Sequence, residues 1–177
     1  MIMVMWIVEL MLAFVIGGIP FGMIVCQSLN LQSPNTYGSK NIGASNVARQ
    51  NVYAGALTLL LDALKGVLAV ILFGNHGSII FAVVAGHCFS PLLRFNGGKG
   101  VATALGAITA ATPHISAVLM IIWLTVFLKK NVPATASITC SVILALYAAL
   151  LKSPWLVATA LMIIIRHIPN VRKAIEA

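Results

Sequence analysis

The chain has 177 residues, of which 60% are hydrophobic and only 8% are charged, and its mean hydropathy is +1.04. A soluble domain of this size could not bury so much apolar surface, since Asp and Glu together number three and no polar face alternates with the apolar stretches. The net charge of +8 comes from Lys and Arg residues dispersed between apolar runs, which argues against nucleic-acid binding. The composition therefore predicts an all-α integral membrane protein.

Apolar stretches follow one another along the chain at residues 4–28, 52–73, 78–92, 100–112, 115–128, 133–150 and 154–168. The first is expected to remain in the protein as a helix, because it lacks the basic start and the cleavage site of a signal peptide. Several stretches are shorter than the roughly 20 residues of a perpendicular span, so we expect tilted helices or locally thinned lipid. Pro113 leaves an alternative open, since a proline can bend a transmembrane helix without ending it, and one kinked helix over 100–128 would leave six segments.

The positive charges favour the seven-segment arrangement. Basic residues near helix ends stay on the cytoplasmic side. With the N-terminus outside, nine of the eleven Lys and Arg residues fall on that side, namely Lys40, Arg49, Arg94, Lys99, Lys129, Lys130, Arg166, Arg172 and Lys173. Six segments would place the last three outside. We therefore predict one membrane-embedded domain over residues 1–177, with about seven short transmembrane helices, the N-terminus outside and the C-terminus cytoplasmic.

The first inner loop, residues 37–49, has the composition of an anion-binding site. Glycines allow backbone N–H groups to converge on an oxyanion, serine hydroxyls add donors, and basic side chains supply charge. The candidate residues are Gly38, Ser39, Lys40, Asn41, Gly43, Ser45 and Arg49. A helix that began near Gly43 would point its positive end at the same place. The alternative is a loop whose small residues only turn the chain.

The second inner loop, residues 86–100, repeats this composition in Gly97-Gly98-Lys99-Gly100. Phosphate is again the natural ligand, although the excess of positive charge on the cytoplasmic side alone explains the basic residues of this loop. A third polar cluster, at 166–173, falls on the same side and is also typical of the basic end of a membrane helix.

Two ionisable residues, Asp62 and Lys65, lie three positions apart inside the second apolar stretch. That spacing places them on one helical face, where they can form an ion pair. Such a pair can be functional or structural. Asp62, Lys65 and His87 are therefore candidates for a structural or supporting role. No His, Asp or Glu cluster has the spacing of metal ligands, so we expect no metal.

In chain order these motifs resemble those of the bacterial acyl-phosphate:glycerol-3-phosphate acyltransferases, the PlsY family. The matching segments are residues 18–22, 38–49, 61–66, 86–103 and 166–170. The resemblance implies transfer of a fatty acyl group from acyl phosphate to the 1-hydroxyl of sn-glycerol 3-phosphate, which yields lysophosphatidic acid and phosphate early in phospholipid synthesis. It also implies a multi-pass protein of the bacterial inner membrane with its active site at the cytoplasmic face and no cofactor. The enzyme that forms acyl phosphate is a candidate partner.

Carried over by position, the resemblance implies catalytic roles for Ser39, Arg49, Lys99, His167 and Asn170. It implies phosphate binding by Gly38, Ser39, Lys40, Asn41, Gly43, Ser45, Arg49, Gly97, Gly98 and Lys99. The chain departs from the family at Ser45, commonly Thr, at Pro169, commonly Glu, and in its early end after the third motif. Pro169 lacks a carboxylate and an N–H donor, which weakens any acid or base role for the tail.

Two questions stay open at this level. The general base is either His167 or a phosphate oxygen of a substrate. A small transporter or channel for an anionic solute is the alternative function, supported by Gly and Pro breaks and by intramembrane charges. Its weakness is that the polar clusters fall on one face and that the sequence shows no internal repeat.

Overall fold

A computed structural model describes the backbone of residues 2–175 and the side chains of residues 2–169, and the secondary structure of these residues is entirely helical. The helices are α1 (Ile2–Gly17), α2 (Phe21–Ser28), α3 (Ala44–Val47), α4 (Val52–Phe73), α5 (Gly77–Cys88), the 3-10 helix η1 (Pro91–Leu93), α6 (Val101–Ala111), α7 (Pro113–Lys130), α8 (Pro133–Leu150) and α9 (Pro154–Ile175). The all-α prediction is confirmed.

Four helical segments of the described chain are long and apolar enough to cross a membrane, and three shorter apolar helices accompany them. The long segments are Ile2–Ser28, Val52–Phe73, Pro113–Lys130 and Pro133–Leu150, and the shorter ones are Gly77–Leu93, Val101–Ala111 and Pro154–Pro169. Large apolar side chains such as Ile71, Ile121 and Leu146 are exposed. An apolar exterior of this kind is suited to lipid as the solvent.

Two breaks in the apolar stretches have different outcomes for the prediction. At Pro113 the structure has two helices and not one kinked helix, because Thr112 leaves the helical region with φ −148° and ψ 79°. In the first stretch the expectation of one continuous helix is wrong, since α1 ends at Gly17 and α2 begins at Phe21. Pro20 has no N–H to continue the helical hydrogen bonds. At the break, Ser90 and Lys65 donate to the carbonyls of Gly18 and Ile19.

Glycines let neighbouring helices approach backbone to backbone. A Cβ on Gly17 of α1 would collide with the Val83 carbonyl of α5, and one on Gly86 of α5 would collide with the Phe14 carbonyl of α1. Gly66 of α4 and Gly106 of α6 face each other's helices in the same reciprocal way. Membrane helices gain packing energy from such close contacts, since lipid gives no hydrophobic drive for their association.

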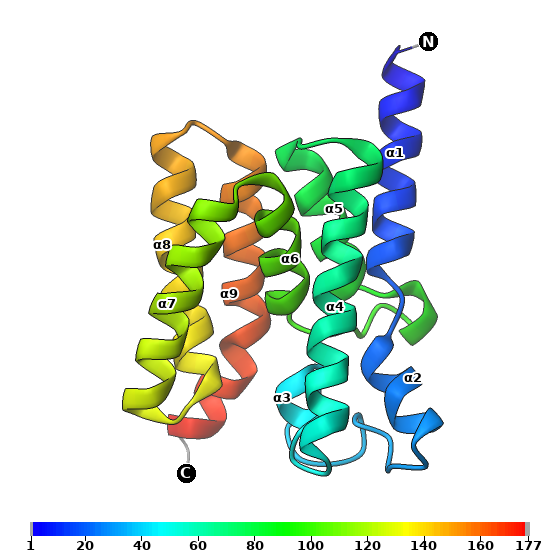
Figure 1. Ribbon diagram of the computed structural model, residues 1–177, viewed down its shortest axis with the longest axis vertical. Helices are drawn as coiled ribbons and strands as arrows, with labels where there is room; N and C mark the ends of the chain where they lie inside the picture. Colours follow the sequence, from blue (N-terminus) through cyan, green and yellow to red (C-terminus); the bar gives the residue numbers. More distant parts are fainter. Residues whose placement is uncertain (1, 176–177) are drawn as a thin grey trace.

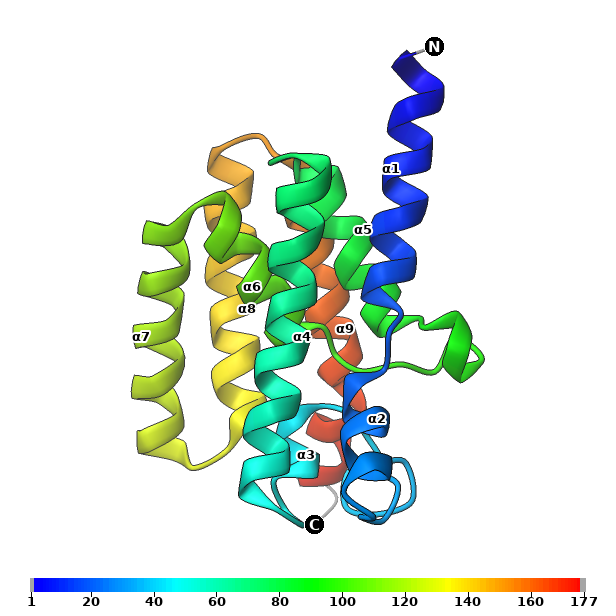
Figure 2. The same cartoon turned by 45° about the vertical axis from the view of Figure 1, so that its right-hand side comes forward.

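The arrangement of the helices places the first polar loop at one end of the bundle and the second partway along it. The loop from α2 to the start of α4 and the C-terminal end of α9 lie at the end opposite to the N-terminus (Figures 1 and 2). Helices α5 and α6 are short, with 12 and 11 residues. The loop between them therefore turns partway along the bundle, beside α9 (Figure 2).

Candidate active site

The side chain of Asn46 forms hydrogen bonds with four backbone groups of the first loop and its approach. Its Oδ1 accepts from the Ser39 N–H at 3.0 Å, and its Nδ2 donates to the carbonyls of Pro34, Tyr37 and Asn41 at 2.8, 3.2 and 3.0 Å. The side chain is 2% exposed, and a buried amide must meet its hydrogen-bonding capacity inside the protein. Asn46 therefore fixes the path of residues 34–46.

The backbone of this loop presents donors toward its exterior. Within the described residues, the N–H groups of residues 41–45 have no acceptor in the protein. They lead into α3, whose N-cap is Gly43, so a helix starts at the place considered from the sequence. Consecutive free N–H groups of this kind bind anions.

The charged and hydroxyl side chains of the first loop lie around this backbone. Gly38 has φ +56° and a Cβ there would collide with Asn46 Oδ1 and lie 3.4 Å from Arg49 Cδ, so Arg49 passes over the glycine. Arg49, Lys40 and Ser45 are exposed and Ser39 is half-buried. Gly43 has ordinary space around its α-carbon, so the protein's own packing does not require a glycine there.

The second loop is built differently from our expectation. The N–H groups of Gly97 and Gly98 donate to the carbonyls of Cys88 and His87, at 3.1 and 2.9 Å, and are therefore unavailable to a ligand. Their carbonyls accept from Arg166 of α9, from Nη2 at 2.6 Å and from Nε at 3.0 Å. The guanidinium of Arg166 therefore holds the two glycine carbonyls while the N–H groups of the same glycines bind α5.

The free donors of the second loop follow the glycine pair. In the described part of the chain, the N–H groups of residues 99–103 have no acceptor in the protein. Gly100, at φ +83°, is the N-cap of α6, so these groups stand at the positive end of an eleven-residue helix. The two loops therefore share one device, a run of free N–H groups at a helix start.

Lys99 and Arg166 give the second loop its charge. Burial and, less strongly, the neighbouring Arg166 guanidinium lower the pKa of Lys99 to about 8. The ion pairs found among the described residues all involve Asp62, and none reaches Lys99 or Arg166. Two close cations without a carboxylate favour an anionic ligand.

His167 lies near Lys99 and is 2% exposed. Its Nδ1 is 2.8 Å from the Ile163 carbonyl, which can only accept, so Nδ1 carries the proton and Nε2 has a free lone pair. The ring is thus in the tautomer that can accept a proton. The side chain of Asn170, like those of Arg172 and Lys173, lies outside the described residues.

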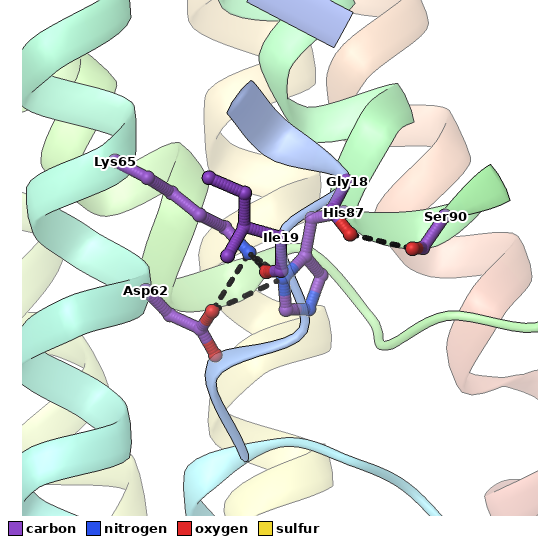
Figure 3. A network of polar contacts seen from close by, with 6 residues as sticks. All are labelled: Gly18, Ile19, Asp62, Lys65, His87 and Ser90. Carbon is purple, nitrogen blue, oxygen red and sulfur yellow. Dashed lines mark hydrogen bonds and ion pairs between the residues drawn. The ribbon is translucent and has the colours of Figure 1, made fainter. Parts of the chain in front are cut away.

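Three further candidates form a buried network between the two loops and the helix break (Figure 3). Lys65 Nζ is 2.8 Å from Asp62 Oδ1, 2.8 Å from the Ile19 carbonyl and 2.9 Å from His87 Nδ1. The predicted Asp62–Lys65 pair is therefore present, and His87 belongs to it. All three side chains are 4% exposed or less, and their polar contacts in the described structure are with one another and with the Ile19 carbonyl.

Sequence reasoning named neither Asn46 nor Arg166 as a site residue, although both lie in the motifs. A buried asparagine has no sequence signature. Arg166 gave one signal in the sequence, because it directly follows the apolar run 161–165. A guanidinium in that position must find hydrogen-bond acceptors inside the protein unless it reaches the lipid surface.

Other parts of the molecule carry less chemistry. A cavity of about 340 Å³ lies at the end of the bundle away from the first loop. Asn75, Thr112, Tyr147 and Ser153 line it among apolar residues, and none of the basic residues of the two loops does. Among the described residues, no group of three His, Cys, Asp or Glu side chains could hold a metal ion.

Comparison with known proteins identifies the family. The family profile described as glycerol-3-phosphate acyltransferase matches residues 7–177. The chain is 39% identical to the glycerol-3-phosphate acyltransferase of Neisseria meningitidis serogroup C and 36% identical to that of Laribacter hongkongensis, each over 93% of this chain and 90% of the relative.

Two crystal structures share the fold, both of PlsY (YgiH), an integral membrane glycerol 3-phosphate acyltransferase. They are the glycerol 3-phosphate form, with a TM-score of 0.85, and the lysophosphatidic acid form, with a TM-score of 0.83. Each is 31% identical, and the match covers 97% of this chain and 92% of the other. The chain is an all-helical, multi-pass integral membrane enzyme and belongs to the glycerol-3-phosphate acyltransferase family.

Proposed function

We propose that this chain transfers a fatty acyl group from acyl phosphate to the 1-hydroxyl of sn-glycerol 3-phosphate, forming lysophosphatidic acid and phosphate. The observation that carries the proposal is the cluster of Lys99, Arg166 and the free N–H groups of residues 99–103, with no carboxylate in an ion pair with either cation among the described residues. The related PlsY structures are glycerol 3-phosphate and lysophosphatidic acid forms, which are the substrate and product expected here.

Two phosphate groups have two places to bind. One is the first loop, with the N–H groups of residues 41–45 beside Arg49 and Ser39, and the other is the start of α6 beside Lys99. Both loops lie between helices with apolar exteriors, so an acyl chain can stay in lipid while its phosphate meets the site. A transporter would place such groups between two related halves, and the sequence shows no internal repeat.

The reaction needs little covalent help from the protein. The hydroxyl oxygen attacks the acyl carbonyl, a new C–O ester bond forms, and the bond from the carbonyl carbon to the phosphate oxygen breaks. Phosphate is a good leaving group, so orientation and neutralisation of its developing charge supply most of the rate. The hydroxyl proton passes to His167 Nε2 or to a phosphate oxygen, and ends on the released phosphate.

His167→Gln separates the two proton acceptors. Loss of a general base lowers kcat by roughly a hundred- to ten-thousandfold. A smaller loss, with an unchanged pH profile of kcat, would assign proton removal to the substrate phosphate.

The donor is tested with the purified protein in detergent. We expect palmitoyl phosphate and glycerol 3-phosphate to give lysophosphatidic acid and one equivalent of phosphate. Comparable turnover with palmitoyl-CoA or palmitoyl-acyl carrier protein would overturn the acyl-phosphate assignment. In the cell, the enzyme that forms acyl phosphate would act immediately upstream.

We further propose that all seven apolar segments cross the bacterial inner membrane, with the N-terminus outside and the site at the cytoplasmic face. The distribution of basic residues supports this orientation. Single cysteines at positions 40, 76 and 170, in a variant without Cys26, Cys88 and Cys140, test it with membrane-impermeant reagents. Positions 40 and 170 should react only from the cytoplasmic side, and position 76 only from outside.

A further inference from the structure

Two charged side chains of α4 contact one edge of the His87 ring. Its Nδ1 lies 2.9 Å from Lys65 Nζ and 3.5 Å from Asp62 Oδ1, as Figure 3 shows. The ammonium of Lys65 has only donors, so its contact with His87 requires a lone pair on Nδ1 and places the ring proton on Nε2. The network thus fixes both the tautomer and the direction of the ring.

The other edge of this ring faces the phosphate-binding loop. A Cβ on Gly98 would collide with His87 Nε2, and its next contacts would be the neighbouring carbons of the same ring. Gly98 has no positive φ, so its backbone conformation would accept alanine. The imidazole of His87 is therefore the reason that a glycine stands at position 98.

Opposite contacts hold the glycine pair in one position. His87 supports Gly98 with its ring and with its carbonyl, which accepts the Gly98 N–H. Arg166 binds the carbonyls of Gly97 and Gly98 from α9. Lys99 and the free N–H groups of α6 follow immediately along the chain, so their direction depends on this pair.

We propose that His87, anchored by Lys65 and Asp62, is a positioning residue that sets the Gly97–Gly98 backbone and through it aims Lys99 and the start of α6 at the substrate phosphate. The proposal deepens the function proposed above and rests on it. It gives the buried Asp62–Lys65–His87 network a role in substrate binding that acts through this backbone.

A purely structural role for the network makes a different prediction. Lys65 and Ser90 both satisfy carbonyls of the α1–α2 break, those of Ile19 and Gly18. Ser90 is 1% exposed and lies close to His87 in the chain, yet no hydrogen bond joins its side chain to Gly97 or Gly98 in the described structure. Ser90→Ala is therefore the matched control for damage to the helix break alone.

The first experiment compares His87→Ala, Ser90→Ala and Lys99→Met in the purified protein. Misplaced binding groups weaken substrate binding or catalysis by roughly ten- to a hundredfold. His87→Ala should therefore raise KM by about that factor. The rise should fall on the same substrate whose KM is raised by Lys99→Met, with kcat changed less. Ser90→Ala should lower Tm and leave both KM values within about twofold.

The second experiment tests the contact itself and does not depend on the stability of one variant. Gly98→Ala should raise the same KM, and adding His87→Ala should cost nothing further, because removal of the ring makes room for the methyl group. Gly97→Ala is the control, since a Cβ there collides with the main chain of His87 and Cys88. His87→Ala should therefore fail to relieve Gly97→Ala.

The outcomes separate the two proposals. A wild-type protein that forms no lysophosphatidic acid removes the proposed function. A positioning role for His87 is overturned if the wild type is active while His87→Ala keeps both KM values, or if the effects of Gly98→Ala and His87→Ala simply multiply.

Discussion

The two loops of the site present similar chemical groups but hold their backbones by different means. The first loop is fixed from within, because the four hydrogen bonds of Asn46 reach partners only 5 to 12 residues away. The second loop combines a support from outside with one of its own, because Arg166 of α9 binds its glycine carbonyls across 68 and 69 residues, while His87, at the start of the loop, packs against Gly98.

This difference predicts different responses to substitution. A loop whose backbone is held by one side chain, here called its hub (Asn46), should lose its whole conformation when that side chain is removed. A loop supported by several helices should lose function in steps, since each support can be removed while the others remain. The predictions below test this contrast in order of decreasing effect.

The largest effect should come from Asn46→Asp. The carboxylate keeps an acceptor for the Ser39 N–H but replaces the Nδ2 donor with an oxygen that faces the carbonyls of Pro34, Tyr37 and Asn41. Each lost buried hydrogen bond costs about 1–3 kcal/mol, so kcat/KM should fall by about a thousandfold or more. Steady-state assays of the purified variant, with Tm in detergent, measure both consequences.

Gln50→Ala is the control for this hub. Gln50 also binds this region through its side chain, accepting from the Gln32 N–H at 3.1 Å and donating to the Gln32 carbonyl at 2.8 Å, but these bonds are exposed. We expect a loss below about threefold. Equal losses in the two variants would contradict the central role of Asn46.

The second effect concerns Arg49, which is exposed and passes over Gly38. Its guanidinium can bind a substrate phosphate with two parallel hydrogen bonds, which a lysine cannot reproduce. Arg49→Lys should therefore lower kcat/KM by about a hundredfold, or nearly 3 kcal/mol. Arg94→Lys, on the exposed part of the second loop, should cost little. Near-normal affinity for glycerol 3-phosphate in Arg49→Lys would refute the assignment of the first loop.

Arg166→Lys should have a smaller effect, because it removes only one of several supports of the second loop. A lysine can reach one of the two glycine carbonyls but not both in the geometry of the guanidinium. We expect a loss of about thirtyfold, expressed mainly in the KM that Lys99→Met raises. A loss as large as that of Asn46→Asp would show that the second loop also fails as a unit.

The same contrast explains how far the sequence could be interpreted. The all-α character and the Asp62–Lys65 pair depend on neighbours in the chain, and the structure has both. Composition also predicts an anion site in both loops, which stays a prediction. These features are local, so spacing along the sequence is sufficient to predict them.

What the sequence could not predict depends on how the helices pack. The glycine pair was expected to donate N–H groups to phosphate, but α5 takes those groups and the donors lie at residues 99–103. The role of Gly98 depends on the ring of His87, and that of Arg166 on two carbonyls of another loop. Only the packing of α4, α5 and α9 brings these residues together.

The smallest effect should be the dependence of binding on pH through Lys99, which directly follows the glycine pair of the second loop. Burial and the adjacent Arg166 lower its pKa to about 8, so the charged form that attracts phosphate is lost as the pH rises through that value. Between pH 7 and pH 9 the charged fraction falls about tenfold, while a substrate phosphate, with its second pKa near 6, keeps its charge.

The KM that Lys99→Met raises should therefore increase up to about tenfold over this interval in the wild type, less where bound phosphate raises the lysine pKa. Lys99→Arg retains its charge throughout and should show a flat profile, even if its KM is higher at every pH. Arg166→Lys should keep the pH dependence, since it leaves a cation beside Lys99. If Lys99→Arg follows the same rise in KM as the wild type, another group controls the binding of phosphate, and the charge of the second loop does not act through Lys99.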